Sequence, residues 1–242
     1  MFAPPYVAAD RFEGQLAALG HAVVSPSTVQ RSFDIEAEQL AELPRFWNDL
    51  PADAYLKDGG RYRFRRHSCF VADGTQLTQA PHRAHWQPLD YNALHGGIER
   101  MFEPLAPEMC ALPAWQGLLL GLAGVASQLK GERPWFIESH AFRIDTASGI
   151  GRPTPEGAHR DGVDLVAVFL VDRHAIKGGE SRVFEAQGPS GQRFTMTEPW
   201  TLLLLDDERV IHETTPIQQE GAAPGHRDTL VVTLRAGGFQ GP

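Results

Sequence analysis

The run Leu165-Val166-Ala167-Val168-Phe169-Leu170-Val171 is apolar at every position and rich in β-branched residues. A short apolar run of this kind is typical of a strand buried in a β core. Glycine and proline punctuate the segments around it, and the other β-rich runs lie at 135–144, 181–184, 193–196, 201–205, 210–215 and 228–234. Many short strands separated by such turn signals predict a β-sandwich or a jelly-roll barrel.

The preceding half of the chain has a helical pattern instead. Apolar residues recur at helical spacing within 6–19, and Gly20 is placed to end that helix. A short strand is expected at 21–25, followed by a helix that opens at Ser27 and by a third helix within 35–47, which Pro44 interrupts. The clearest helix spans 113–130, because proline lies at its start and glycine directly after its end.

A strong turn signal at 57–60 precedes the alternating segment 61–65, so we expect a β-hairpin there. The arginines of 61–66 are expected on a solvated face of this strand. The pattern as a whole predicts a mainly-β α+β fold and a single domain over 1–242. In this domain an α-rich N-terminal layer (1–133) packs on a β core (134–242).

The composition bounds the function. The 242 residues are 42% hydrophobic and 21% charged, as in an ordinary globular protein. Acidic residues outnumber Lys and Arg by 30 to 22, and the basic residues form no long run, which disfavours nucleic-acid coating or binding to anionic membranes. The N-terminus lacks a signal-peptide pattern, and the apolar stretch 114–129 is shorter than the ~18 residues that a membrane span needs. With Cys69 and Cys110 expected as reduced thiols, the sequence predicts a cytoplasmic protein.

Three side chains have the chemistry of a metal site. His159 and Asp161 stand two positions apart, so on a strand they share one face. His212 lies within the β-rich run 210–215 and is a third candidate ligand. Two histidines and one carboxylate that leave the remaining positions open are the ligand set of non-haem Fe(II) oxygenases. The triplet alone is weak evidence, because a second such triplet occurs at His226 and Asp228.

Arg227 stands at the head of the last β-rich run, fifteen residues after His212. A forked guanidinium next to a metal suits the far carboxylate of a dicarboxylate co-substrate. An ordinary salt bridge on an edge strand is the alternative. Arg235 lies on the same face, eight residues later, and is expected to be too far from the metal.

Four blocks now occur in order, and together they are far more specific than any one of them: PEGAHRDGVD at 155–164, GGES at 178–181, DERVIH at 207–212 and RDTLVVT at 227–233. This series resembles the small bacterial 2-oxoglutarate/Fe(II)-dependent dioxygenases of the L-isoleucine dioxygenase and BsmA type. The resemblance covers about residues 135–235. It implies a double-stranded β-helix, which is a cupin-like jelly roll.

The resemblance also implies roles for individual residues. His159, Asp161 and His212 would bind Fe(II), and Arg227 would bind the C5 carboxylate of 2-oxoglutarate. The enzyme would then use O₂ to hydroxylate a small substrate, a free L-amino acid or a derivative, and release succinate and CO₂. Arg143 and His140, on the expected strand 135–144, are candidates to meet the substrate's carboxylate, although a salt bridge at the rim of the core is an equal alternative for Arg143.

Two other functions stay open. The BsmA branch suggests a non-catalytic regulatory protein, associated with stress or biofilm formation, that keeps the metal pocket. A cupin-type enzyme that uses another divalent metal without 2-oxoglutarate is the third. His82 and His85 lie in a proline-flanked segment, 81–88, whose pattern favours a polar loop over a zinc site.

Overall fold

A computed structural model describes residues 1–91, 94 and 96–241. Its largest element is a seven-stranded sheet whose neighbouring strands all run antiparallel. In spatial order the strands are β1 (His21–Val24), β9 (Leu202–Asp206), β5 (Leu165–His174), β12 (His226–Ala236), β4 (Trp135–Asp145), β2 (Arg63–Asp73) and β3 (Gln76–Gln79). The N-terminal half of the chain therefore completes both edges of this sheet.

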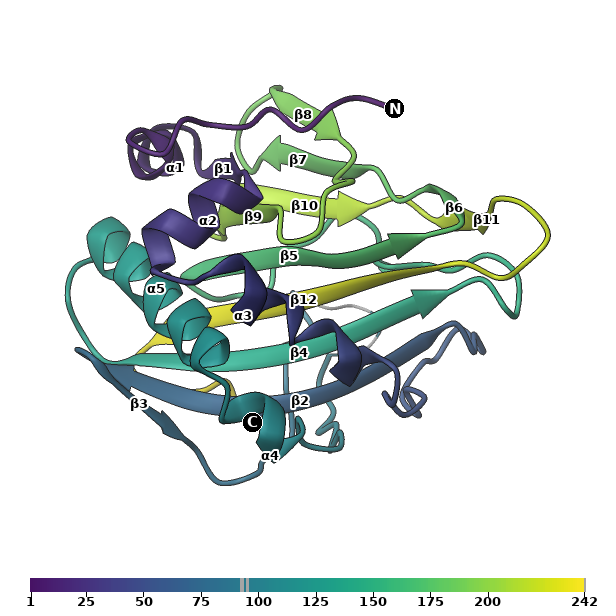
Figure 1. Ribbon diagram of the computed structural model, residues 1–242, viewed down its shortest axis with the longest axis horizontal. Helices are drawn as coiled ribbons and strands as arrows, with labels where there is room; N and C mark the ends of the chain where they lie inside the picture. Colours follow the sequence, from purple (N-terminus) through teal and green to yellow (C-terminus); the bar gives the residue numbers. More distant parts are fainter. Residues whose placement is uncertain (92–93, 95, 242) are drawn as a thin grey trace.

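Two smaller sheets accompany the large one (Figure 1). One contains β10 (Val210–Thr214), β7 (Ser181–Glu185) and β8 (Gly191–Phe194), and the other contains β11 (Ile217–Gln219) and β6 (Ile176–Gly178). Buried apolar side chains, among them Val168 of β5, Val183 of β7 and Phe194 of β8, pack the three-stranded sheet against the large one. The fold is therefore a mostly antiparallel β structure of the jelly-roll type, as the sequence predicts.

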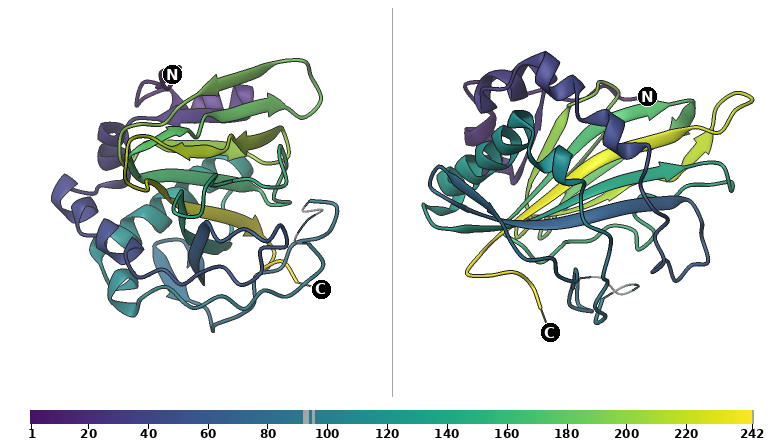
Figure 2. Two further views of the ribbon diagram at one scale, coloured as in Figure 1. Left: turned by 90° about the vertical axis from the view of Figure 1, so that its right-hand side faces the viewer. Right: turned by 60° about the horizontal axis from the view of Figure 1, so that its bottom comes forward.

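The helices gather on one side of the large sheet (Figure 2). They are α1 (Phe12–Leu19), α2 (Pro26–Phe33), α3 (Ala37–Ala41), the 3₁₀ helix η1 (Pro44–Trp47), α4 (Pro107–Cys110) and α5 (Pro113–Lys130). The largest apolar core lies between them and the sheet, where Leu118 and Leu122 of α5 join Leu230 and Val232 of β12. Since β1, β2 and β3 come from the same half of the chain, the N-terminal part is a mixed layer rather than a purely helical one.

Several boundaries differ from the sequence prediction. Helix α5 has the predicted bounds, whereas α1 begins at Phe12, because the segment before it is extended and Tyr6 bridges to Val23. Ser25, not Ser27, caps α2, since its side chain accepts a hydrogen bond from the Thr28 amide. The reversal predicted at 57–65 is present only as a short antiparallel bridge between Ala52 and Phe64 of β2. The full strand partner of β2 on this side is β3, to which the chain turns back at 74–75.

Alternation along the central strands sorts their side chains between two environments. On β12, Leu230 and Val232 face the helical core, whereas Arg227 and Thr229 line a cavity on the opposite face. The same alternation places Glu138 and His140 of β4 in that cavity. The sheet thus supplies one wall of the candidate site.

None of the helices within 1–91, 94 and 96–241 has both the length and the apolar character that bilayer crossing demands.

Candidate active site

His159, Asp161 and His212 come together at the mouth of the jelly roll. His159 lies in the loop between β4 and β5 and forms an isolated antiparallel bridge with His212 of β10. The Nε2 atoms of His159 and His212 lie 3.8 and 4.0 Å from the two oxygens of Asp161. One ligand atom from each of the three residues falls within 4.8 Å of the others. Two imidazoles and a carboxylate so arranged form a site for a divalent transition metal with open positions.

Neighbouring groups hold the His159–Asp161 loop in place. The carboxylate of Asp207 accepts hydrogen bonds from three successive amides, those of residues 161–163, at 2.7 to 3.1 Å. His159 donates from Nδ1 to the Gly157 carbonyl at 2.9 Å, which leaves the Nε2 lone pair for a metal. Gln87 donates to Asp161 Oδ1 at 3.0 Å. These contacts orient two of the three candidate ligands.

The charges of this site are strongly coupled. Burial disfavours a charged His159 ring, but the carboxylates of Asp161 and Glu156 outweigh it and raise the pKa of His159. Burial and the nearby His159 lower the pKa of His212 to about 4. Burial and the charge of Asp161 raise the pKa of Asp207 to about 6. Metal binding requires neutral imidazoles, and the lowered pKa of His212 keeps its ring neutral at neutral pH.

Arg227 is buried in the same cavity without a hydrogen-bonding partner for most of its guanidinium. The side chain starts from β12, the residue is 3% exposed, and both Nε and Nη2 are buried with no partner in the structure. Burial, and then the charge of Arg173, lower the pKa of Arg227 to about 10, so it stays cationic at neutral pH. A buried cation with unused donors fits an anionic ligand, and a carboxylate matches its forked geometry. The salt bridge considered for Arg227 is not present among the described residues.

The two residues predicted to meet the substrate's carboxylate, His140 and Arg143, point to opposite faces of β4. His140 lines the cavity, as expected of a pocket residue. Arg143 does not: it lies on the opposite face of β4, where it forms a bidentate ion pair with Asp228 at 2.7 and 2.8 Å. Residues three apart on a strand point to opposite faces, which explains the difference. Arg143 therefore does not face the cavity, and its ion pair is the salt bridge that the sequence offered as the alternative. Arg235 lines the cavity together with Arg227.

The sequence analysis missed a cationic group on β2. Arg63 and Arg65, expected in solvent, are 6% and 4% exposed and line the cavity, as does the buried Arg100. Asp53 forms an ion pair with Arg63 at 2.7 Å and approaches Arg65 at 3.8 Å. The charges of Arg63 and Arg65 overcome the effect of burial and lower the pKa of Asp53. The alternation within 61–66 indicates that Arg63 and Arg65 share one face of the strand, but it does not tell which part of the chain covers that face.

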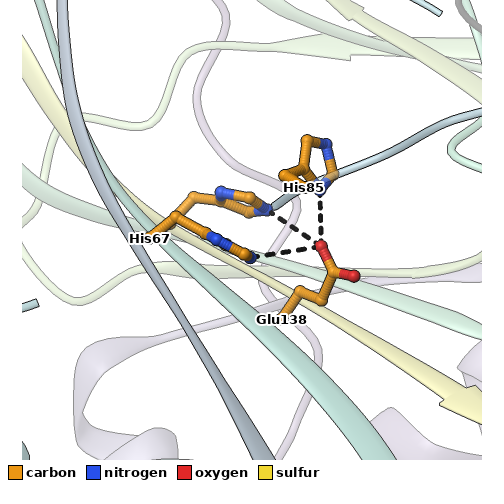
Figure 3. A group of neighbouring side chains, drawn as sticks. His67, His85 and Glu138 are labelled. Atoms are coloured by element: carbon orange, nitrogen blue, oxygen red, sulfur yellow. Dashed lines mark hydrogen bonds and ion pairs between the residues drawn. The ribbon is translucent and has the colours of Figure 1, made fainter. Parts of the chain in front are cut away.

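A second cluster, consisting of His67, His85, Glu138 and His140, lies beside these arginines. Figure 3 shows His67 and His85 directed at one carboxylate oxygen of Glu138, at 3.2 and 2.5 Å. These hydrogen bonds outweigh burial and lower the pKa of Glu138, while burial lowers the pKa of His85 to about 4. Segment 81–88 is a loop, as predicted, but His85 within it is buried and bridges to Arg100. An ionised Glu138 thus accepts from two neutral imidazoles.

This cluster has four potential metal ligands within 4.8 Å of one another, but its surroundings favour a hydrogen-bond network. Arg65 Nη2 donates to His140 Nδ1 at 2.6 Å, which places the proton of a neutral His140 on Nε2, the nitrogen facing Glu138. Burial lowers the pKa of His140, and the nearby cations Arg65 and Arg100 lower it further. A divalent ion would add charge to an already cationic region.

The chain matches the 2OG-Fe dioxygenase family over residues 44–233, and it belongs to that family. Enzymes of this family use Fe(II), 2-oxoglutarate and O₂, which agrees with the His159–Asp161–His212 donor set and the unpartnered Arg227. No curated protein matches the chain.

Three solved structures are similar to this chain over nearly its whole length. A BsmA homologue from Methylobium petroleophilum is 49% identical, with a TM-score of 0.94 over 99% of this chain and 98% of that one. IDO from Bacillus thuringiensis has 18% identity and a TM-score of 0.76, over 97% of this chain and 100% of that one. The Fe(II)/α-ketoglutarate-dependent dioxygenase TqaL has 18% identity and a TM-score of 0.72, over 94% and 86%. The last two likenesses concern the fold alone.

Proposed function

We propose that His159, Asp161 and His212 bind Fe(II), and that Arg227 binds the far carboxylate of 2-oxoglutarate in an enzyme that hydroxylates a small substrate. One observation carries the proposal: a buried guanidinium with unpartnered Nε and Nη2 lines the same cavity as a two-histidine, one-carboxylate cluster. A metal chelate anchored at its far end by a cation requires both features together.

When bound, Fe(II) and 2-oxoglutarate would supply the oxidising chemistry with O₂ as the oxidant: one oxygen atom of O₂ enters succinate as the co-substrate loses CO₂, and the other enters the substrate. The chain contributes orientation and exclusion of water. The Gly157 carbonyl and Gln87 set the angles of His159 and Asp161, and Arg227 fixes the co-substrate's direction. Phe136, Phe142 and Val231 supply apolar wall between the polar groups, which keeps water from the reacting atoms.

The substrate that we propose is a free L-amino acid or a close derivative, as in the L-isoleucine dioxygenase type of the family. The cavity supports it, because cationic and anionic side chains line it beside apolar ones: Arg65 and Arg100, then Glu156, then Phe142 and Val168. A small zwitterion with an apolar side chain is complementary to such a surface.

The test is succinate formation from 2-oxoglutarate with Fe(II) and ascorbate, over a panel of L-amino acids. Arg227→Gln should raise the KM for 2-oxoglutarate about tenfold or more, since hydrogen bonds to a charged group are worth about 1.5–3 kcal/mol. Arg182→Gln is the control. Arg182, on β7, forms ion pairs with Glu180 and Glu213 and does not line the cavity. An unchanged KM in Arg227→Gln refutes the assignment of Arg227.

The second candidate function is a non-catalytic, stress- or biofilm-associated regulatory protein that retains the pocket. It is supported by the 49% identity to a BsmA homologue. Such a protein would bind metal and 2-oxoglutarate yet form no succinate with any member of the panel. A cupin-type enzyme without 2-oxoglutarate would bind the metal but show no binding of 2-oxoglutarate for Arg227→Gln to weaken. The same variants thus separate the three functions.

A further inference from the structure

We infer that Arg65 and Arg100 form a subsite for a carboxylate of the substrate, so that the enzyme acts on small organic acids. The inference rests on the proposed function for its chemistry, but the subsite is defined by its own donors. Both residues line the cavity that contains the His159–Asp161–His212 cluster, and both are almost completely buried.

The Arg65 guanidinium is fixed in place. Its faces lie against the Phe102 and Phe142 rings, with its central carbon 3.7 and 4.3 Å from the ring centroids. Nη2 donates to His140 Nδ1 at 2.6 Å. Nε is buried and has no partner in the structure. Arg65 is thus a rigid donor with one direction unused, as a site prepared for a ligand requires.

Arg100 repeats this arrangement from another segment. Its Nη2 donates to Gln87 Oε1 at 2.9 Å, while its Nε is buried without a partner. Gln87 also donates to Asp161 Oδ1, so a hydrogen-bonded path of two steps joins Arg100 to the candidate metal ligand. This path links the cationic end of the cavity to the candidate metal site.

Two carboxylates near these arginines, Asp53 and Glu138, are engaged elsewhere. Asp53 accepts from Arg63 Nε at 2.7 Å and meets Arg65 only through Nη1, at 3.8 Å. Glu138 accepts from His67 and His85. Neither carboxylate reaches Nε of Arg65 or Arg100, and leaving such buried donors unpaired is unfavourable. A ligand carboxylate, planar and with two acceptor oxygens, would satisfy both.

The test compares each L-amino acid with its carboxamide, which has the same shape without the charge. Binding is measured by the shift in melting temperature of the full chain with Mn(II) and 2-oxoglutarate present. We expect at least one acid to stabilise the protein and its carboxamide to bind about tenfold more weakly or worse, because the charged oxygen is lost.

Variants assign the effect to the two arginines. Arg100→Gln should weaken binding of that acid about tenfold or more while the 2-oxoglutarate affinity changes less than twofold. Arg227→Gln should do the reverse, and Arg182→Gln should change neither. Arg100→Lys, which keeps the charge but not the fork, serves if Arg100→Gln fails to fold, and should lose part of the affinity.

Three results would overturn the inference: no acid stabilises the protein, acid and carboxamide bind equally, or the Arg100 variants weaken 2-oxoglutarate instead of the acid. Failure of the proposed function gives a different result. In that case, no succinate forms, while the preference for acid over carboxamide still decides whether the subsite exists.

Discussion

His159 and His212 exchange two backbone hydrogen bonds: each amide donates to the other's carbonyl, at 3.0 and 2.9 Å. This bridge ties the loop after β4 to strand β10, and it brings the two imidazole centroids within 4.6 Å of each other. Since main-chain bonds and the Asp207 carboxylate hold this arrangement, the candidate ligands are already positioned by the fold. If they bind a metal, its binding would be separable from folding, in contrast to zinc fingers.

His212→Ala should abolish tight Fe(II) binding and leave the melting temperature of the metal-free protein within a few degrees of wild type. The side chain supplies a ligand, whereas the bridge that it sits on is made by main-chain atoms, which alanine retains. Isothermal titration with Fe(II) under anaerobic conditions measures the affinity. His174→Ala, at an exposed histidine, is the matched control. Unchanged affinity in His212→Ala would refute the metal assignment.

Gln87→Leu should weaken Fe(II) binding about 10–100-fold, as loss of an orienting partner does in other metal sites. The substitution removes the amide that donates to Asp161 Oδ1 at 3.0 Å, so that carboxylate can rotate. The same titration detects the change, and Gln192→Leu, at an exposed glutamine of β8, controls for loss of an amide. Equal affinities for Gln87→Leu and wild type would mean that Asp207 and the backbone orient Asp161 without Gln87.

The fold and the clustering of His159, Asp161 and His212 were accessible from sequence because both depend on local pattern: strand runs with turn signals, and candidate ligands in ordered blocks. Arg63 and Arg65 were not, since period-two alternation marks two faces of a strand without saying which one the rest of the chain covers. Here His85 and Phe102, which lie beyond the β2–β3 hairpin in sequence, cover that face. The opposite orientations of His140 and Arg143 were accessible from sequence, because residues three apart on a strand point to opposite faces.

Asp53→Asn should lower the free energy of unfolding by about 3–5 kcal/mol at neutral pH, because it leaves Arg63 buried without its counter-charge. The pKa of Asp53 is lowered in the folded state, so the ionised carboxylate stabilises the protein above its ordinary value of 3.8, and this contribution disappears as the pH falls through the lower folded value. The difference between variant and wild type should be equal at pH 7 and 5 and smaller at pH 3.5.

Urea denaturation at those three pH values measures this difference. Asp73→Asn, at the exposed end of β2, is the control and should change stability by less than about 0.5 kcal/mol. A difference for Asp53→Asn that stays constant down to pH 3.5 would show that the charge of Asp53 is not its source.

The cluster of His67, His85, Glu138 and His140 should bind no metal of its own. Elemental analysis of protein loaded with Fe(II) should give one ion per chain, and His67→Asn should keep that ratio, because Glu138 already accepts from two imidazoles and Arg65 occupies His140 Nδ1. Two ions per wild-type chain, falling to one in His67→Asn, would instead make this cluster a second metal centre.

A crystal structure grown without oxygen, with Mn(II) and 2-oxoglutarate, tests the central claim most directly. We expect anomalous density for one ion between His159 Nε2, Asp161 and His212 Nε2, with the far carboxylate of 2-oxoglutarate on Nε and Nη2 of Arg227. An ion held by His67, His85 and Glu138, or a 2-oxoglutarate carboxylate seated on Arg65 and Arg100, would contradict the assignment.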